Sequence, residues 1–319
     1  MPTTRRPRHG TMQFYPRKRA RRPIARVRSW ANVKEAKALG FAGYKVGMIH
    51  LMIADNRPTA LTKGETISCP ATIIECPPLK VASIRFYKNS IYGFKTVSDV
   101  FADNLDKELE RKIIMPKSKK SKIEDVKDFD DITLVVHTQP KLTGIGKKKP
   151  EIFEVGIGGN KEDKLKYAKE ILGKEINVKD IFKDGQQLDI HAITKGKGLQ
   201  GPVRRFGVQL RSHKSEKSRR NPGSLGDWRS QMHTMWRVAH AGQLGYFQRR
   251  ELNKWLVKIG DKPIIAEGGF HKYGVIKNPY ILVRGSIAGS KKRLIRFNNA
   301  TRPSKKIPKE APVIKEFVI

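Results

Sequence analysis

The chain has 319 residues with 66 Lys or Arg against 30 Asp or Glu, which gives a formal net charge of +36 at pH 7. No run approaches the roughly 18 apolar residues of a membrane span. Two cysteines without a matching histidine pair make neither a zinc site nor a disulfide framework. A balance this positive indicates a protein that works in contact with nucleic acid, in a reducing, cytoplasmic setting.

The N-terminal segment is the most basic part of the chain, since its first 34 residues contain no acid and eleven Lys or Arg. Such a segment repels itself until a polyanion neutralises it. A mitochondrial transit peptide has a similar composition, but four prolines within 23 residues disfavour the amphipathic helix that it needs. We therefore expect a basic extension over residues 1–40 that contacts RNA through Arg5, Arg6, Arg8, Arg17, Arg19, Arg21 and Arg22.

Short runs of β-forming residues, separated by turn signals such as Cys76-Pro77-Pro78, predict a mainly β fold. The predicted strands are 44–53, 71–76, 81–87, 188–193, 280–283 and 294–297. Many short strands of this kind favour an antiparallel β-barrel, closed or partly closed. We expect its parts to be residues 41–98, a strand within 188–200, and residues 259–300, followed by a C-terminal tail over 301–319.

Residues 99–189 differ from the rest because they are neutral, with 19 acids and 19 Lys or Arg. Their pattern predicts a helix ending near Arg111, strands over 132–138 and 152–157, and a helix over 161–172 that stops at Gly173. We interpret residues 99–187 as an α/β insertion on the solvent side of the barrel. The lysine run at 117–122 fits a flexible loop better than a binding site.

Residues 195–258 combine 15 Lys or Arg with three acids, and their aromatic residues are isolated. Guanidinium groups bond phosphates and flat rings stack on bases, so this composition suits RNA, although a disordered basic loop is the alternative. We predict a basic finger over 201–258. The predicted rRNA-binding residues here, and in the acid-free stretch 268–309, are Lys195, Lys197, Arg204, Arg205, Arg211, Lys214, Arg219, Arg220, Trp228, Arg229, His233, Trp236, Arg237, His240, Arg249, Arg250, Lys291, Lys292 and Arg293.

One enzyme signature occurs in this region, the spacing Gly196-x-Gly198-x-x-Gly201 after a predicted strand. A dinucleotide site also needs an apolar helix after the glycines, and here prolines and arginines follow. His233 and His240 have no acid nearby in the sequence to make them catalytic. We therefore expect no enzyme activity, no catalytic residue, no metal and no cofactor.

Several long motifs closely resemble the ribosomal protein L3 family in its archaeal form. They are DIHAITKGKGLQGPVRRFG (189–207), NPGSLGDW (221–228), MWRVAHAGQLGYFQRR (235–250), EGGFHKY (267–273) and LVRGSIAGSKKRLIR (282–296), and the N-terminal arm ending AGYKVGM (42–48) also matches. The resemblance covers essentially the whole chain and is weakest over residues 99–189.

The resemblance implies a fold and a location that composition does not. The implied fold is a β-barrel shared with translation elongation factors, with an N-terminal extension and a finger that enter large-subunit rRNA. The finger tip, which maps onto Trp228, approaches the peptidyl-transferase centre where A-site tRNA is accommodated. The resemblance also implies a role in early subunit assembly. The implied partners are 23S-type rRNA and neighbouring ribosomal proteins, including uL14 and eL24.

Three functions compete on this sequence. The first is a structural rRNA-binding protein of the large ribosomal subunit, the second a free-standing RNA chaperone or nucleoid-type binder, and the third an enzyme. A general binder tolerates scattered charge, whereas this chain separates a neutral insertion from basic segments. The pattern therefore favours the first.

Overall fold

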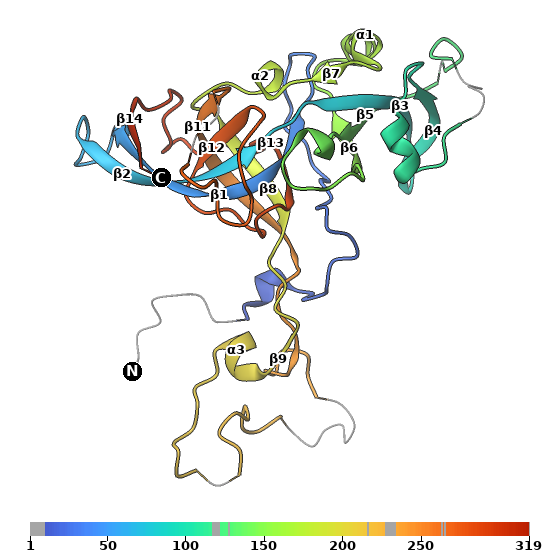
Figure 1. Ribbon diagram of the computed structural model, residues 1–319. Coiled ribbons are helices and arrows are strands. Elements are labelled where there is room, and N and C mark those ends of the chain that lie inside the picture. The colour runs from blue at the N-terminus through green and yellow to red at the C-terminus, as the bar shows by residue number, and fades with distance from the viewer. Residues whose placement is uncertain are drawn as a thin grey trace. The chain divides into compact units, whose positions relative to one another are not determined.

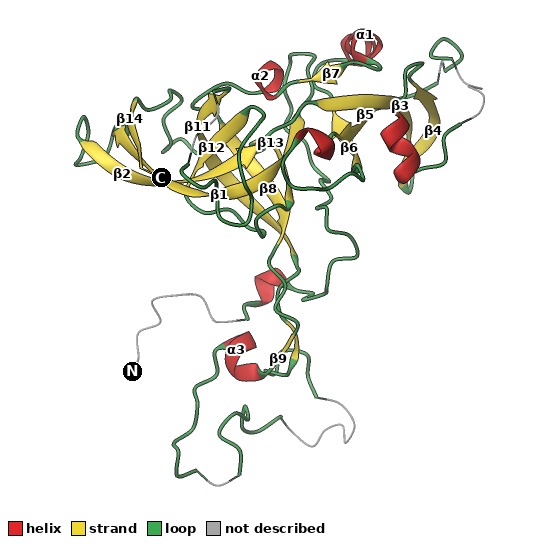
Figure 2. Ribbon diagram, in the orientation of Figure 1, coloured by secondary structure: helices red, strands yellow, loops and turns green. Residues whose placement is uncertain are grey.

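The computed structural model describes residues 10–116, 122–126, 128–215, 217–226, 234–262, 264 and 266–318. These residues are mainly β, with 36% in strands and 11% in helices, and the strands form antiparallel sheets, as the sequence predicts (Figure 2). The chain divides into two compact units. The arm unit comprises residues 1–22 and 193–248, and the sheet unit comprises residues 23–192 and 249–319.

A seven-stranded antiparallel sheet dominates the sheet unit (Figure 1). Its order is β13-β8-β11-β12-β2-β1-β14, and β13 also pairs with β1, from Gly40 opposite Asn298 to Tyr44 opposite Leu294. Six strands therefore form a continuous ring of pairings, and β14 is added to β1 outside it. The bounds are β1 (Gly40–Ala54), β2 (Thr66–Glu75), β8 (Gln187–Ile193), β11 (Gln248–Gly260), β12 (Tyr280–Arg284), β13 (Leu294–Asn299) and β14 (Ile314–Val318).

Aromatic and β-branched side chains from these strands form the core. Phe297 on β13 lies 5.9 Å from the ring of Phe41 and 5.5 Å from that of Phe182. Every residue of β13 is buried, and so is every residue of β8 after its first. Burial therefore covers both faces of these two strands, including their polar residues Asp189, His191 and Arg296.

A second sheet, with order β4-β3-β5-β6 and β7 paired to the start of β3, forms the other part of the sheet unit. Two helices and two short 3-10 turns accompany it. The bounds are β3 (Leu79–Ser90), β4 (Gly93–Phe101), β5 (Asp131–Thr138), β6 (Ile152–Gly156), β7 (Glu175–Ile176), α1 (Lys161–Ile171), α2 (Val178–Ile181) and the 3-10 turns Lys107–Arg111 and Pro140–Leu142.

Two expected boundaries differ from the observed sheets. The predicted strand 81–87 is present as β3, but it pairs in the second sheet and not within the seven-stranded sheet. The last part of the expected finger, residues 248–258, lies in β11, which pairs with β12. Strand propensity is local, whereas the sheet that a strand joins depends on distant partners, so the sequence pattern could not separate these cases.

Part of the expected N-terminal extension, from residue 23 onward, belongs to the sheet unit. Ala25 is 1% exposed, and its main-chain oxygen accepts a hydrogen bond of 3.1 Å from Arg296 on β13. The same guanidinium donates to the main-chain oxygen of Glu154 on β6 at 2.5 Å and lies over the ring of Phe153. Arg296 thereby joins the N-terminal segment, the first sheet and the second sheet.

Candidate nucleic-acid interface

The arm unit is built on a two-stranded stem formed by residues 193–201 and 242–248. Main-chain hydrogen bonds join Thr194 to Phe247, Lys197 to Leu244, and Leu244 to Gly198, each 2.9 Å long. Gly245 has a φ of +71°, and a Cβ there would lie 2.1 Å from the oxygen of Lys195, so only glycine lets the two strands approach this closely.

The three glycines of the dinucleotide-like spacing belong to this stem and to a short helix. Gly198 accepts a stem hydrogen bond, and Gly201 precedes α3 (Pro202–Phe206), which has only five residues. Gly207 ends that helix in the left-handed conformation. A nucleotide fold needs a full helix packed on a parallel sheet, and these glycines precede no such helix.

The N-terminal arm lies against the stem within the arm unit. The amide of Ala20 donates to the oxygen of Tyr246 at 2.9 Å, and the guanidinium of Arg19 lies 5.5 Å from the Tyr246 ring centre. Further along the arm, Arg17 donates to the main-chain oxygen of Arg205 at 3.1 Å. Hydrogen bonds and cation–π contacts, rather than a core, hold these two segments together.

Phe206, which is 6% exposed, is the apolar centre of this contact. The guanidinium of Arg17 lies 4.6 Å from its ring centre and that of Arg205 lies 5.1 Å from it. Arg205 also donates to the main-chain oxygens of His240 at 3.0 Å and Gln243 at 3.2 Å. Burial and the nearby charge of Arg17 lower the pKa of Arg205.

Most of the other predicted rRNA-binding residues of the arm unit are exposed. Trp236 is 59% exposed, and its ring meets Tyr15 edge-on at 5.1 Å. An exposed ring among cations is a platform on which a base can stack. The exposed predicted cations of this unit are Arg19, Arg21, Arg22, Lys195, Lys197, Arg204, Arg211, Lys214, Arg219, Arg220 and Arg237.

Six predicted residues lie outside the described part of the chain. These are Arg5, Arg6, Arg8, Trp228, Arg229 and His233. The prediction of Trp228 as the finger tip therefore stays a prediction.

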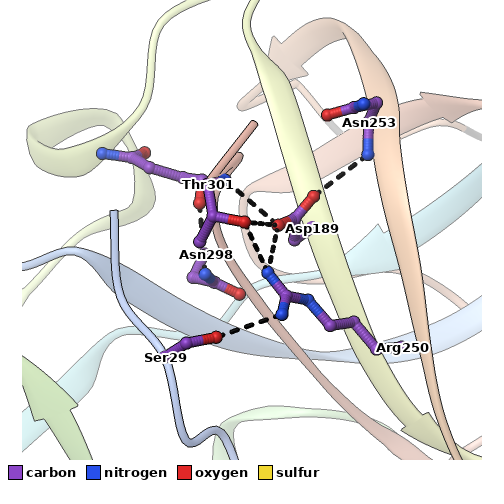
Figure 3. A network of polar contacts seen from close by, with 7 residues as sticks. Ser29, Asp189, Arg250, Asn253, Asn298 and Thr301 are labelled. Atoms are coloured by element: carbon purple, nitrogen blue, oxygen red, sulfur yellow. Dashed lines mark hydrogen bonds and ion pairs between the residues drawn. The ribbon is translucent and has the colours of Figure 1, made fainter. Parts of the chain in front are cut away.

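In the sheet unit, Arg250 is engaged by the protein itself (Figure 3). Its guanidinium donates to Asp189 at 2.8 Å, to Thr301 at 2.6 Å and to Ser29 at 3.1 Å. Asp189 is fully buried and also accepts hydrogen bonds from the amides of Asn253 and Thr301. These contacts give Arg250 a structural role within the sheet unit.

The charges around this network shift two pKa values. Burial alone raises the pKa of Asp189, but the hydrogen bonds from Arg250, Asn253 and Thr301 outweigh it and hold the pKa below its usual 3.8. His191, two residues further along β8, is 4% exposed. Burial, with the charges of Arg250 and Arg296, lowers the pKa of His191 to about 4, so its ring is neutral at physiological pH.

The last predicted cluster, Lys291 to Arg293, lies in the turn before β13. Lys291 donates to the main-chain oxygen of His271 at 2.8 Å, and the amide of Lys292 donates to Lys45 on β1. Both lysines are exposed, while Arg293 and Arg249 are partly buried. This turn belongs to the sheet unit, whereas most of the predicted rRNA-binding residues belong to the arm unit.

Sequence reasoning missed the aromatic partners Tyr15, Phe206 and Tyr246 that hold the arm on the stem. The local signal was the alternation of arginine with aromatic residues at Tyr15-x-Arg17 and at Arg205-Phe206. Such an alternation is compatible with RNA contacts and with internal packing alike, and only the fold separates the two.

Within the described ranges, no three His, Cys, Asp or Glu side chains are grouped so that they could hold a metal ion. None of the helices described is both long enough and apolar enough to cross a membrane.

Comparison with known proteins gives one consistent match. The family described as Ribosomal protein L3 matches residues 1–319. A large ribosomal subunit protein uL3 from Methanosphaera stadtmanae is 49% identical over 314 residues, which covers 94% of this chain and 93% of the relative. The proteins of the same name from Methanocaldococcus jannaschii and Archaeoglobus fulgidus are each 45% identical. They cover 95% and 94% of this chain, and 94% and 93% of their own length.

Proposed function

Because the chain belongs to the ribosomal protein L3 family and is a structural constituent of the large ribosomal subunit, we propose that it binds 23S-type rRNA through the arm unit. Its relatives are named as ribosomal proteins and not as enzymes. Membership in the large subunit implies rRNA and ribosomal proteins as partners. It also removes the reason to prefer a free-standing RNA chaperone.

The distribution of charge is the observation that carries this proposal. The arm unit contains 19 Lys or Arg and only two acids, whereas residues 99–189 are balanced. Closely spaced cations repel one another unless phosphates lie between them. A segment with this charge and so little apolar surface is stable only against a polyanion.

Within this proposal the predicted residues divide into two roles. Arg17 and Arg205 hold the arm on the stem, because carbonyl oxygens and the Phe206 ring already occupy their guanidinium groups. The exposed cations contact phosphates, and Trp236 offers a base-stacking face.

We also infer that the ring of six paired strands is a β-barrel of the translation-protein type. The pairing of β13 with β1 supports this, because it joins the two ends of the strand path. We keep the domain division expected from the sequence with two changes. The insertion begins at β3 instead of residue 99, and the finger ends where β11 begins instead of at residue 258. The N-terminal arm and the finger are then extensions that enter rRNA.

The finer assignments rest on the family resemblance. They are a role in early subunit assembly, the organisation of RNA near the peptidyl-transferase centre and the A-site, and contacts with uL14 and eL24. Cytoplasmic localisation follows from residence in the ribosome.

Salt-dependent binding of the full chain to large-subunit rRNA tests the proposal. Lys214→Glu with Arg220→Glu removes two exposed cations of the arm unit, and each lost phosphate contact reduces the log–log salt slope by roughly 0.7. Lys166→Glu with Lys169→Glu makes the same charge change on α1 and is the matched control. Equal losses in the two double variants contradict binding through the arm unit.

A further inference from the structure

The tip of the β3–β4 hairpin exposes apolar residues where turns normally carry polar ones. Ile91 and Tyr92 form the two-residue turn, and each is 99% exposed. Such turns usually contain Asn, Asp, Gly or Ser. Gly93, with a φ of +107°, supplies the left-handed conformation that reverses the chain, so the turn itself does not require these two side chains.

Further apolar side chains extend this patch along β4. Phe94 is 64% exposed and Val97 is 47% exposed. The Phe94 ring meets Tyr87 on β3 edge-on at 6.2 Å, which steadies the ring and leaves most of it open. Tyr92 has no hydrogen-bond or ring partner among the residues that the structure describes. A cluster of this size, unlike a single exposed side chain, marks an interaction site.

The charges around the hairpin argue against RNA as the occupant. Lys88 is paired with Asp128, and Arg85 is held by Asp99 and Glu154. The amide of Asn89 donates to Asp130 at 2.7 Å, which places a second carboxylate near the tip. A polyanion would meet carboxylates here and few unpaired cations, in contrast to the arm unit.

Lys95 indicates the chemistry of the partner instead. It lies directly opposite Lys88 in the β3–β4 register, and like charges so placed destabilise a strand pair. Asp128 compensates Lys88, whereas no acid among the described residues is paired with Lys95. A partner that brings an acidic side chain to Lys95 relieves this repulsion.

β4 is the edge strand of its sheet, and the opposite edge, β6, lies beside β1 (Figure 1). We propose that the hairpin tip is a docking site for a neighbouring protein of the large subunit, which receives Ile91 and Tyr92 in an apolar pocket with an acidic rim. Tyrosine anchors inside a polar rim are typical of protein–protein interfaces. This inference rests on membership in the large subunit and is independent of the proposed rRNA contacts.

Photo-crosslinking in purified large subunits that carry the full chain tests the proposal. A benzophenone amino acid replaces Phe94, and the crosslinked product is identified by mass. The expected product is one ribosomal protein, joined through a segment that contains apolar and acidic residues. A crosslink to rRNA, or no crosslink, overturns the proposal.

Variants then test each part of the site. Ile91→Ser with Tyr92→Asn introduces residues that turns favour, so the hairpin folds while the crosslink yield falls by about tenfold. Lys95→Glu lowers the yield similarly, and Lys95→Arg preserves it. Leu61→Ser, at a fully exposed turn residue elsewhere in the sheet unit, is the matched control and leaves the yield unchanged. Unchanged yields in both site variants overturn the proposal, and rRNA affinity stays constant throughout.

Discussion

The guanidinium of Arg17 donates to the main-chain oxygen of Arg205, 188 residues away in sequence, and both arginines lie over the ring of Phe206. Two cations thus share one aromatic ring. Among the described residues, their hydrogen-bond partners are main-chain carbonyl oxygens and not carboxylates. The cation–π attraction is weak and the two guanidinium groups repel each other, so a phosphate beside them would stabilise the contact. We therefore expect the arm and the finger to order together on the rRNA that we propose they bind.

Arg17→Ala is expected to release the N-terminal arm from the stem. It removes one hydrogen bond and two ring contacts, together about 1–2 kcal/mol. Hydrogen exchange at the amide of Ala20, which bonds to Tyr246, should become faster. Lys18→Ala, at an exposed neighbour, is the control. Unchanged exchange in Arg17→Ala means that the arm is held by other contacts.

His191 should make the sheet unit less stable in mild acid. Its pKa is about 4 in the folded chain and about 6.5 when unfolded, so the unfolded state binds more protons between these values. Stability from this group is complete above pH 6.5 and is lost as pH falls towards 4, by about 3 kcal/mol. The free energy of unfolding against pH measures this. His191→Gln cannot titrate, so an identical slope in that variant contradicts the assignment.

Asp189→Asn is expected to destabilise the sheet unit by about 3 kcal/mol. The change leaves Arg250 without its anion and turns amide hydrogens towards the donors Asn253 and Thr301. Since the pKa of Asp189 is depressed, its contribution is present above pH 3.8 and is lost as pH falls below that value. Chemical denaturation at neutral pH gives the difference, with Glu162→Gln on α1 as the control. A loss no larger than the control's would show that the ion pair is dispensable.

Trp228→Ala is expected to leave folding and subunit incorporation largely intact. Two glycines at 223 and 226 supply turn chemistry before this ring, and its immediate sequence neighbours are polar or basic. Loss of one base stack, worth roughly 1–3 kcal/mol, should instead alter A-site tRNA affinity or sensitivity to drugs acting at the peptidyl-transferase centre. Assembly yield and A-site binding are measured on the same subunits. Failed assembly with normal A-site binding would indicate that Trp228 packs in the protein core.

The sequence by itself determined the features that depend on neighbouring residues. Runs such as Tyr44–Ile53 and Leu294–Phe297 predicted strands that the structure contains, because β-branched and aromatic residues favour the extended backbone of a strand. The separation of the basic segments from the neutral 99–189 stretch is also a property of composition. The long motifs around residues 189–250 identified the family, and the comparisons confirm it.

Only the tertiary structure decided which residues meet across long sequence distances. β3 pairs in the second sheet. Arg17 and Arg205 contact carbonyl oxygens and the ring of Phe206, and Arg250 pairs with the buried carboxylate of Asp189. In the sequence these arginines look no different from other cations of the basic segments, such as Lys214 and Arg220. A guanidinium can donate to a phosphate or to a protein acceptor, so its role is set by which acceptor the fold brings within hydrogen-bonding distance.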